Sequence, residues 1–171
     1  VNLAAALAES GHRVLVVDLD PQANASRRLG VAFDPNNPTV TVSEAIQVGA
    51  EGVAADAIVS SRWPGVYGER VDVIPSRFDL ENRVSEAAVL GAGGRLRRAL
   101  SGVDDEYDVT LIDCPPSLGH LTQLGLAAAD VALCTVEPEY DGVEGAVRFR
   151  DFVVTQAGEL KNPELQLVGF L

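Results

Sequence analysis

The segment VLVVDLDPQAN, residues 14–24, decides the fold and contains the first candidate site. Its short run of apolar, mostly β-branched residues is typical of a strand buried on both faces, as in parallel sheets. Side chains alternate along a strand, so Asp18 and Asp20 are expected on one face and Leu19 on the other. Because ligands of open α/β sheets bind outside the carboxyl ends of the strands, two acids at this end indicate a binding site.

The composition fits one soluble domain. The chain has 171 residues, of which 47% are hydrophobic and 5% aromatic, and this length is enough to bury a core. No apolar run approaches the roughly 18 residues of a membrane-spanning helix, so we expect no membrane association. The formal net charge of −12 argues against this segment being a nucleic-acid-binding surface by itself, since such surfaces are basic.

Strand-like and helix-like patterns alternate along the chain. Strand patterns cover residues 13–20, 71–76, 109–117, 131–138 and 165–171. Helical patterns cover residues 1–9, 43–48, 80–100 (with an interruption at the glycines 91–94), 121–129 and 143–157, while 35–38 is a loop and 49–68 carries no regular pattern. The alternation predicts an α/β fold, doubly wound, with a mostly parallel sheet and helices on both faces. We expect a single domain over residues 1–171.

The two cysteines, Cys114 and Cys134, both lie in apolar, strand-like runs. We expect buried thiols in a reducing cytoplasm rather than a disulfide or a metal site. Cys114 has no histidine near it in sequence and is followed by prolines, so it is expected to be a packed thiol rather than a nucleophile.

A further acid ends another apolar strand. The segment VTLID, residues 109–113, ends on Asp113 and leads into a proline turn. An acid at the end of a buried strand is how a P-loop NTPase holds Mg²⁺, usually through a water. Asp18, Asp20 and Asp113 would then gather at one edge of the sheet. Their mutual repulsion would be relieved by a cation or a positioned water between them.

Three segments carry a family resemblance in order along the chain. They are VNLAAALAESGHRVLVVDLDPQANAS, VIPSRFDLE and YDVTLIDCPPSLGHLTQLGLAAADVALCTVEPEYDGVEG. They resemble the ParA/Soj family of chromosome- and plasmid-partitioning ATPases, in the deviant Walker-A group of P-loop NTPases that also contains MinD. The resemblance covers residues 1–149, and D-x-D-P-Q together with I-D-C-P-P-S is its most specific part.

The resemblance implies a role for each acid. Asp20 would position or polarise the attacking water, Asp113 would be the Walker-B acid of the Mg²⁺ shell, and Asp18 would be a supporting carboxylate near the metal. Residues 137–140 would lie near a nucleotide-sandwich dimer interface. Further nucleotide-site residues would come from the loops after the two strands: Gln22, Asn24, Pro115 and Pro116.

The sequence departs from the family pattern at its ends. The family's glycine-rich P-loop with two lysines should directly precede Val1, whereas the one lysine here is Lys161 and the glycines at 91–94 lack the strand that a phosphate loop follows. Residues 1–9 would be the rest of the helix whose N-terminus cups the phosphates. We therefore expect a piece of a longer protein, truncated at both ends, that alone binds no appreciable ATP and is inactive.

The resemblance implies what the parent protein does. It would bind ATP and Mg²⁺, form an ATP-dependent homodimer and hydrolyse ATP when stimulated by a ParB-like partner. It would bind DNA non-specifically through regions mostly outside this segment, as a cytoplasmic, nucleoid-associated protein.

Alternatives stay open at this stage. A MinD-like ATPase at a membrane surface would need a C-terminal amphipathic helix. A non-hydrolysing scaffold of the same fold would lack the P-loop lysines. A dinucleotide-binding Rossmann domain is disfavoured, because the chain contains no G-x-G-x-x-G and its first strand's acids are followed by Pro-Gln.

Overall fold

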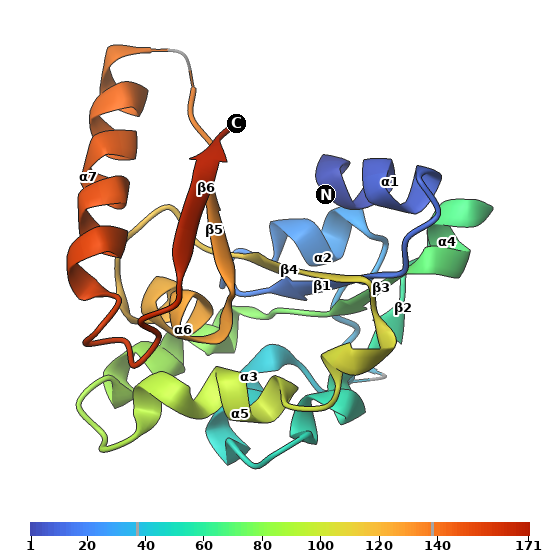
Figure 1. Cartoon of the computed structure of the whole chain (residues 1–171). Coiled ribbons are helices and arrows are strands. Elements are labelled where there is room, and N and C mark those ends of the chain that lie inside the picture. The colour runs from blue at the N-terminus through green and yellow to red at the C-terminus, as the bar shows by residue number, and fades with distance from the viewer. Residues whose placement is uncertain (37, 138) are drawn as a thin grey trace.

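The computed structural model describes residues 1–36, 38–137 and 139–171. The strands are β1 Val14–Asp18, β2 Val59–Ser60, β3 Val71–Ile74, β4 Val109–Asp113, β5 Val131–Cys134 and β6 Gln166–Phe170. The main sheet has the order β2-β3-β1-β4, and β5 and β6 form a separate pair (Figure 1). β1 is parallel to β3 and β4, and β5 is parallel to β6, whereas the short β2 runs antiparallel to β3.

Helices cover both faces of the main sheet. The α-helices are α1 Asn2–Glu9, α2 Asn24–Arg28, α3 Val42–Val48, α4 Val66–Arg70, α5 Arg95–Leu100, α6 His120–Ala128 and α7 Tyr140–Gln156. α1, α2 and α4 lie on one face, α3, α5 and α6 lie on the other, and α7 lies beside the β5-β6 pair (Figure 1). The predicted α/β fold with a mostly parallel sheet is confirmed. No helix in the described part of the chain combines the length and hydropathy needed to cross a membrane.

The alternation of side chains along β1 explains why the sheet has a core on each face. Leu15 and Val17 pack into the larger core with residues of α3, α5 and α6. Val14 and Val16 pack into the other core with residues of α1, α2 and β3. All four side chains are buried, as predicted for a central parallel strand.

The start of α3 shows how local sequence sets a helix boundary. The Thr41 side chain accepts a hydrogen bond from the Ser43 N–H, and the Thr41 N–H donates to the Glu44 carboxylate at 2.9 Å. This capping box satisfies backbone donors that the first turn of a helix leaves free. The helix was predicted from Ser43 with Glu44 in its first turn, and it begins one residue earlier.

Two segments differ from the sequence prediction. Within the predicted helix 80–100 only α5 is α-helical, and 3₁₀ turns precede it at η2 Phe78–Glu86 and η3 Ala92–Gly94. Gly91 adopts a φ of 79°, which interrupts a right-handed helix. The segment 49–68, predicted as irregular, contains the 3₁₀ helix η1 Val53–Ala57, β2 and the first part of α4. A further 3₁₀ turn, η4 Asp104–Glu106, precedes β4.

Two predicted segments extend beyond what the structure describes. Residue 37 belongs to the predicted loop 35–38. Residue 138 belongs to the predicted strand 131–138 and to the segment 137–140. Both residues lie outside the described parts of the chain.

The contact of α6 with the sheet gives a first testable prediction. A Cβ atom at Gly125 would lie 2.6 Å from Cys114 Sγ and 3.4 Å from the Ile112 and Leu19 side chains. We predict that Gly125→Ala lowers the free energy of unfolding by about 1–3 kcal/mol, because the added methyl group overpacks this contact.

A matched control comes from Gly145 in α7, where a Cβ would meet no atom of the described residues within 4 Å. Gly145→Ala should leave the free energy of unfolding unchanged or raise it by up to about 1 kcal/mol, since Ala favours a helix over Gly. Urea denaturation measures both. Equal stabilities of the two variants would show that α6 does not pack this closely.

Candidate functional site

The carboxyl ends of β1 and β4 lie side by side. Their parallel register places Asp18 opposite Asp113, and the Leu19 N–H donates to the Asp113 carbonyl oxygen at 2.8 Å. Burial raises the pKa of both carboxyls, the Asp113 charge adds to this effect on Asp18, and the Asp20 charge adds to it on Asp113. The predicted convergence of Asp18, Asp20 and Asp113 at one sheet edge is thus present in the structure.

Asp18 is held entirely by protein groups. It is 0% exposed, and its Oδ2 accepts hydrogen bonds from the Ser26 N–H at 2.7 Å and the Ser26 hydroxyl at 2.6 Å. Its Oδ1 accepts from the Asp20 N–H at 3.2 Å. Burial raises the pKa of Asp18 despite these hydrogen bonds, which act to lower it. Direct metal ligation by Asp18 would have to compete with these hydrogen bonds at a side chain that has no solvent exposure.

Asp20 begins a tight turn that leads from β1 into α2. Its carboxylate is half-buried and accepts a hydrogen bond from the Gln22 N–H at 2.9 Å, while its carbonyl oxygen accepts from the Ala23 N–H at 2.8 Å. Ala23 adopts a left-handed φ of 52°. The turn places the exposed residues Gln22 and Asn24 next to Asp20, and the Asn24 side chain accepts from Arg27 at 2.8 Å.

Asp113 lies on the solvent side of the same edge. Desolvation raises its pKa, although the residue is exposed at the end of β4. Asp20 raises the pKa further, whereas Arg28 lowers it. The cation of Arg28 therefore acts electrostatically on Asp113.

The loop after β4 is tied to the start of α6. The Thr122 hydroxyl donates to the Ser117 carbonyl at 2.6 Å and also lies 3.3 Å from the Pro115 carbonyl oxygen. Pro115 is half-buried and Pro116 is exposed. The loop is therefore anchored at one end by Asp113 in the sheet and at the other by α6.

The donor set can be tested for its fit to a metal. In residues 1–36, 38–137 and 139–171, no cluster of three or more His, Cys, Asp or Glu side chains could hold a metal ion. Mg²⁺, however, commonly takes one or two carboxylates and completes its shell with waters and substrate phosphates. Asp113 can supply such a single carboxylate, so the site fits Mg²⁺ that arrives with a nucleotide.

The two cysteines are free thiols, but the prediction that they are buried is wrong, since both residues are only half-buried. Burial raises the pKa of Cys114 to about 12, and the Asp113 charge acts in the same direction. A thiol with so high a pKa is not a nucleophile at neutral pH. Cys114 contributes packing against α6 instead.

The sequence analysis did not identify two serines next to Asp18, Ser26 and Ser76. Ser26 bonds to Asp18, and its hydroxyl accepts from the Ser76 N–H at 2.9 Å. The available signal was weak: Ser26 follows Asp18 by eight residues in a short polar segment that resembles a helix surface. Its burial depends on β3, which lies far away along the chain.

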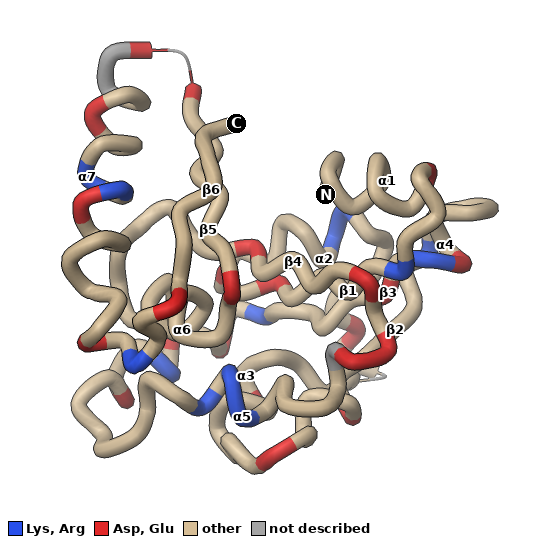
Figure 2. The backbone as a smooth tube through the Cα atoms, viewed as in Figure 1, with Lys and Arg blue, Asp and Glu red and all other residues tan. Residues whose placement is uncertain are grey.

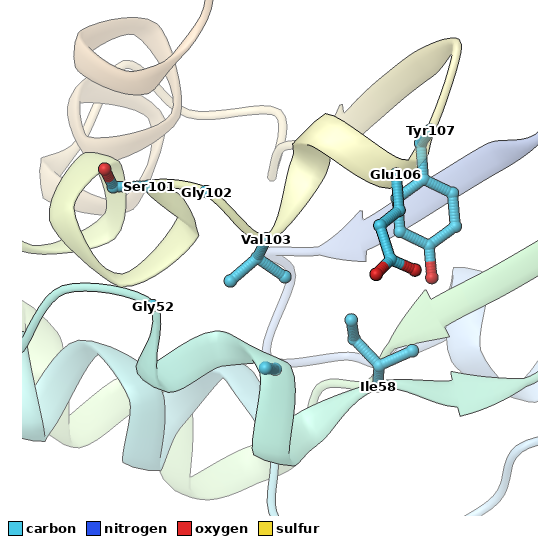
Figure 3. A pocket seen from close by; sticks show the side chains of 8 residues that line it. Gly52, Ile58, Ser101, Gly102, Val103, Glu106 and Tyr107 are labelled. Carbon is cyan, nitrogen blue, oxygen red and sulfur yellow. The ribbon is translucent and has the colours of Figure 1, made fainter.

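The pocket shown in Figure 3 is not lined by Asp18, Asp20 or Asp113. Its volume is about 370 Å³, and Ile58, Val103, Glu106 and Tyr107 are among its lining residues. Tyr107 precedes β4, and its hydroxyl donates to Asp72 near the start of β3 at 2.9 Å. The pocket therefore belongs to the amino edge of the sheet, opposite the edge that carries Asp113.

Comparisons with known proteins establish the family. Residues 1–167 match the family model AAA_31, described as an AAA domain. The chain is 36% identical over 172 residues to the sporulation initiation inhibitor protein Soj of Bacillus subtilis, covering 100% of this chain and 64% of Soj. It is 36% identical over 174 residues to the chromosome partitioning protein ParA of Myxococcus xanthus, covering 100% of this chain and 57% of that protein. The chain belongs to this AAA-domain family, and its predicted membership of the ParA/Soj group is confirmed.

Solved structures confirm the fold. Cyanothece McdA in its apo form superposes with a TM-score of 0.84 at 28% identity, over 99% of this chain and 63% of McdA. A cobyrinic acid a,c-diamide synthase from Mycobacterium smegmatis, solved with ADP and magnesium, gives a TM-score of 0.78 at 35% identity, over 99% and 65% of the two chains. The chain spans about half to two thirds of the length of the relatives it matches.

The raised pKa of Asp18 predicts how stability depends on pH. The folded protein binds this proton more tightly than the unfolded chain, so ionised Asp18 costs stability at neutral pH. This cost is removed as the pH falls through the raised pKa. We predict that the wild type gains stability relative to Asp18→Asn between about pH 7 and about pH 4, the ordinary carboxyl range.

Urea denaturation of both proteins across this range isolates the contribution of Asp18. The variant should also be less stable at neutral pH by about 1–3 kcal/mol, because an amide NH₂ would face the donors that now bond to the carboxylate. A stability difference that stays constant, or that moves in the opposite direction with pH, would contradict a raised pKa.

Proposed function

We propose that this chain is part of a single ATPase domain and carries the acidic residues for ATP hydrolysis in a ParA-like partitioning protein. The observation that carries the proposal is the convergence of Asp20 and Asp113 at one sheet edge, close to the N-terminal end of α1. The membership of the ParA/Soj group and the magnesium and ADP bound to a similar synthase support it. The reaction would convert ATP and water to ADP and phosphate.

Each of the three acids would have its own role in this reaction. Asp113 would hold Mg²⁺ through a water, and Asp20 would orient the attacking water toward the terminal phosphate. The bound Mg²⁺ would neutralise charge that develops on the phosphate oxygens. Asp18 would hold the backbone of Asp20 in place by accepting a hydrogen bond from the Asp20 N–H.

The phosphates themselves would be held by groups near the same edge. The helix of which α1 is a part would direct the backbone N–H groups of its first turn and the positive end of its dipole at the phosphates. We propose that a phosphate-binding loop with lysines precedes Val1 in the complete protein. The loops that contain Gln22, Asn24, Pro115 and Pro116 would then contact the nucleotide or respond to its hydrolysis.

The cellular role follows as part of the same proposal. The complete protein would form an ATP-dependent homodimer, with residues 137–140 near its interface, and a ParB-like partner would stimulate hydrolysis. Acidic residues outnumber basic ones along the chain (Figure 2), so non-specific DNA binding would use regions mostly outside this segment. Such a protein would be cytoplasmic and associated with the nucleoid.

A second candidate function is an ATP-dependent synthase. It is favoured by the 35% identity to the cobyrinic acid a,c-diamide synthase, which was solved with an ATP analogue and magnesium. Both candidates need the same nucleotide site. ATP-dependent retention of the complete protein on non-specific DNA separates them, because the partitioning function requires it and the synthase function does not.

Substitution of the acids tests the proposed chemistry in the complete protein. Asp20→Ala should lower kcat for ATP hydrolysis by about 100-fold or more, with ATP binding largely kept, because it removes the group that orients the water. Asp113→Asn should weaken the Mg²⁺ dependence of nucleotide binding, because a neutral amide is a poorer ligand. Phosphate release and calorimetry measure these effects.

The matched control is Asp56→Ala, since Asp56 is an exposed acid in η1, distant in the chain from the carboxylate edge. Its kcat should stay within about twofold of the wild type, as for most surface substitutions. Hydrolysis by Asp20→Ala at the rate of the Asp56→Ala control would refute the role proposed for Asp20.

A further inference from the structure

One buried hydroxyl joins three segments beneath the carboxylate edge. Ser26, in α2, is 1% exposed, and its hydroxyl donates to Asp18 Oδ2 at 2.6 Å. The same oxygen accepts a hydrogen bond from the Ser76 N–H, directly after β3, at 2.9 Å. The Ser26 N–H donates to the same carboxylate oxygen at 2.7 Å. The end of β1, α2 and the end of β3 therefore meet at one side chain.

The bonds of Ser26 to Oδ2 leave the other carboxylate oxygen of Asp18 directed at the turn formed by residues 20–23. Oδ2 is taken by Ser26, so Oδ1 is free to accept from the Asp20 N–H at 3.2 Å. The orientation of the Asp18 carboxylate thus sets the backbone position of Asp20. Without the hydroxyl, Oδ2 would keep only the bond from the Ser26 N–H, and the carboxylate could rotate more freely about its last torsion angle.

The turn at residues 20–23 contains a strained backbone conformation that surrounding contacts must hold in place. Ala23 adopts a left-handed φ of 52°, which costs a residue with a Cβ about 1–2 kcal/mol. Such a conformation persists only where surrounding contacts enforce it. Two of them come from Asp20 itself, whose carboxylate and carbonyl oxygens accept from the Gln22 and Ala23 N–H groups. A small rotation of Asp20 would therefore disturb the whole turn.

Stability alone does not account for the pair of Ser26 and Asp18. Burial raises the pKa of Asp18, which means that the fold disfavours its charged form. Replacing buried, paired charges by apolar residues of similar volume is often neutral or stabilising. A buried hydroxyl and carboxylate instead provide a defined geometry, because hydrogen bonds are directional and apolar contacts are not.

We propose that Ser26 is a positioning residue for ATP hydrolysis: it orients the Asp18 carboxylate, which in turn holds the backbone of Asp20 in the geometry for catalysis. This inference rests on the proposed function. Ser26 itself touches no reacting atom, so its substitution should act on turnover and leave the binding of ATP almost unchanged.

The experiment uses the complete protein and measures kcat and KM for ATP. Ser26→Ala should lower kcat by about 10- to 100-fold, since small displacements of a catalytic group have effects of this size. KM should change by less than about twofold, as expected for an interaction that acts only in the transition state. Ser26→Thr, which keeps the hydroxyl, should recover most of the lost turnover.

The control is Ser61→Ala. Ser61 is also buried, at 7% exposure, but follows β2 and has its hydroxyl 3.4 Å from the Tyr67 carbonyl oxygen, away from the carboxylate edge. Its kcat should match the wild type within about twofold. If Ser26→Ala does not fold, as judged by its melting transition, Ser26→Cys replaces it, since a thiol keeps the volume and is a weak donor.

A double-mutant cycle distinguishes a positioning role of Ser26 toward Asp20 from a general loss of activity. In an Asp20→Ala background, Ser26→Ala should leave the residual rate unchanged, because the group that Ser26 positions is already gone. A wild-type kcat for Ser26→Ala, or an equal loss with and without Asp20, would overturn the inference. A wild-type protein that hydrolyses no ATP would instead refute the proposed function, so the two failures are distinguishable.

Discussion

The parallel pairing of β1 with β4 is the constraint on which the rest of the site depends. It brings Asp18 opposite Asp113, and the Leu19 N–H extends the pairing by one residue to the Asp113 carbonyl oxygen. β1 is buried between the two apolar cores, and Leu111 and Ile112 of β4 pack against opposite cores, so a slip of β4 by one residue would turn each to the wrong face. The position of the carboxylates is therefore fixed by the packing of the whole domain.

The site combines two carboxylates whose charged forms are disfavoured by the fold, Asp18 and Asp113, with hydrogen bonds that hold Asp18 in place. Burial raises the pKa of both Asp18 and Asp113, and each is close enough to another carboxylate to be raised further. Only part of this cost is offset by hydrogen bonds from Ser26 and the backbone. A cation delivered beside Asp113 would relieve the remaining repulsion, which gives the site a physical reason to bind magnesium with a nucleotide.

The sequence predicted the fold well where local pattern and packing agree. The central strand, the Asp113 strand, and the helices α1, α6 and α7 were recognised because each has a clear apolar period or a run of small helix-forming residues. The stretch before α5 was predicted only in part: its interruption at the glycines 91–94 was expected, whereas the 3₁₀ helix η2 was not, because apolar periodicity does not distinguish it from an α-helix. Of the site, the three converging acids were predicted from the strand ends. The burial of Asp18 and the bridge through Ser26 were not, since both depend on the β3 segment that reaches Ser26 from 50 residues away.

The most direct test of this account is a crystal structure of the complete protein with Mg²⁺ and a non-hydrolysable ATP analogue. The account predicts a metal ion bound to the terminal phosphates and linked to Asp113 directly or through a water, with a water between Asp20 and the terminal phosphate. Asp18 should remain bonded to Ser26 and the Asp20 N–H. A nucleotide bound away from this edge, or a metal ion ligated by Asp18 in place of Asp113, would contradict it.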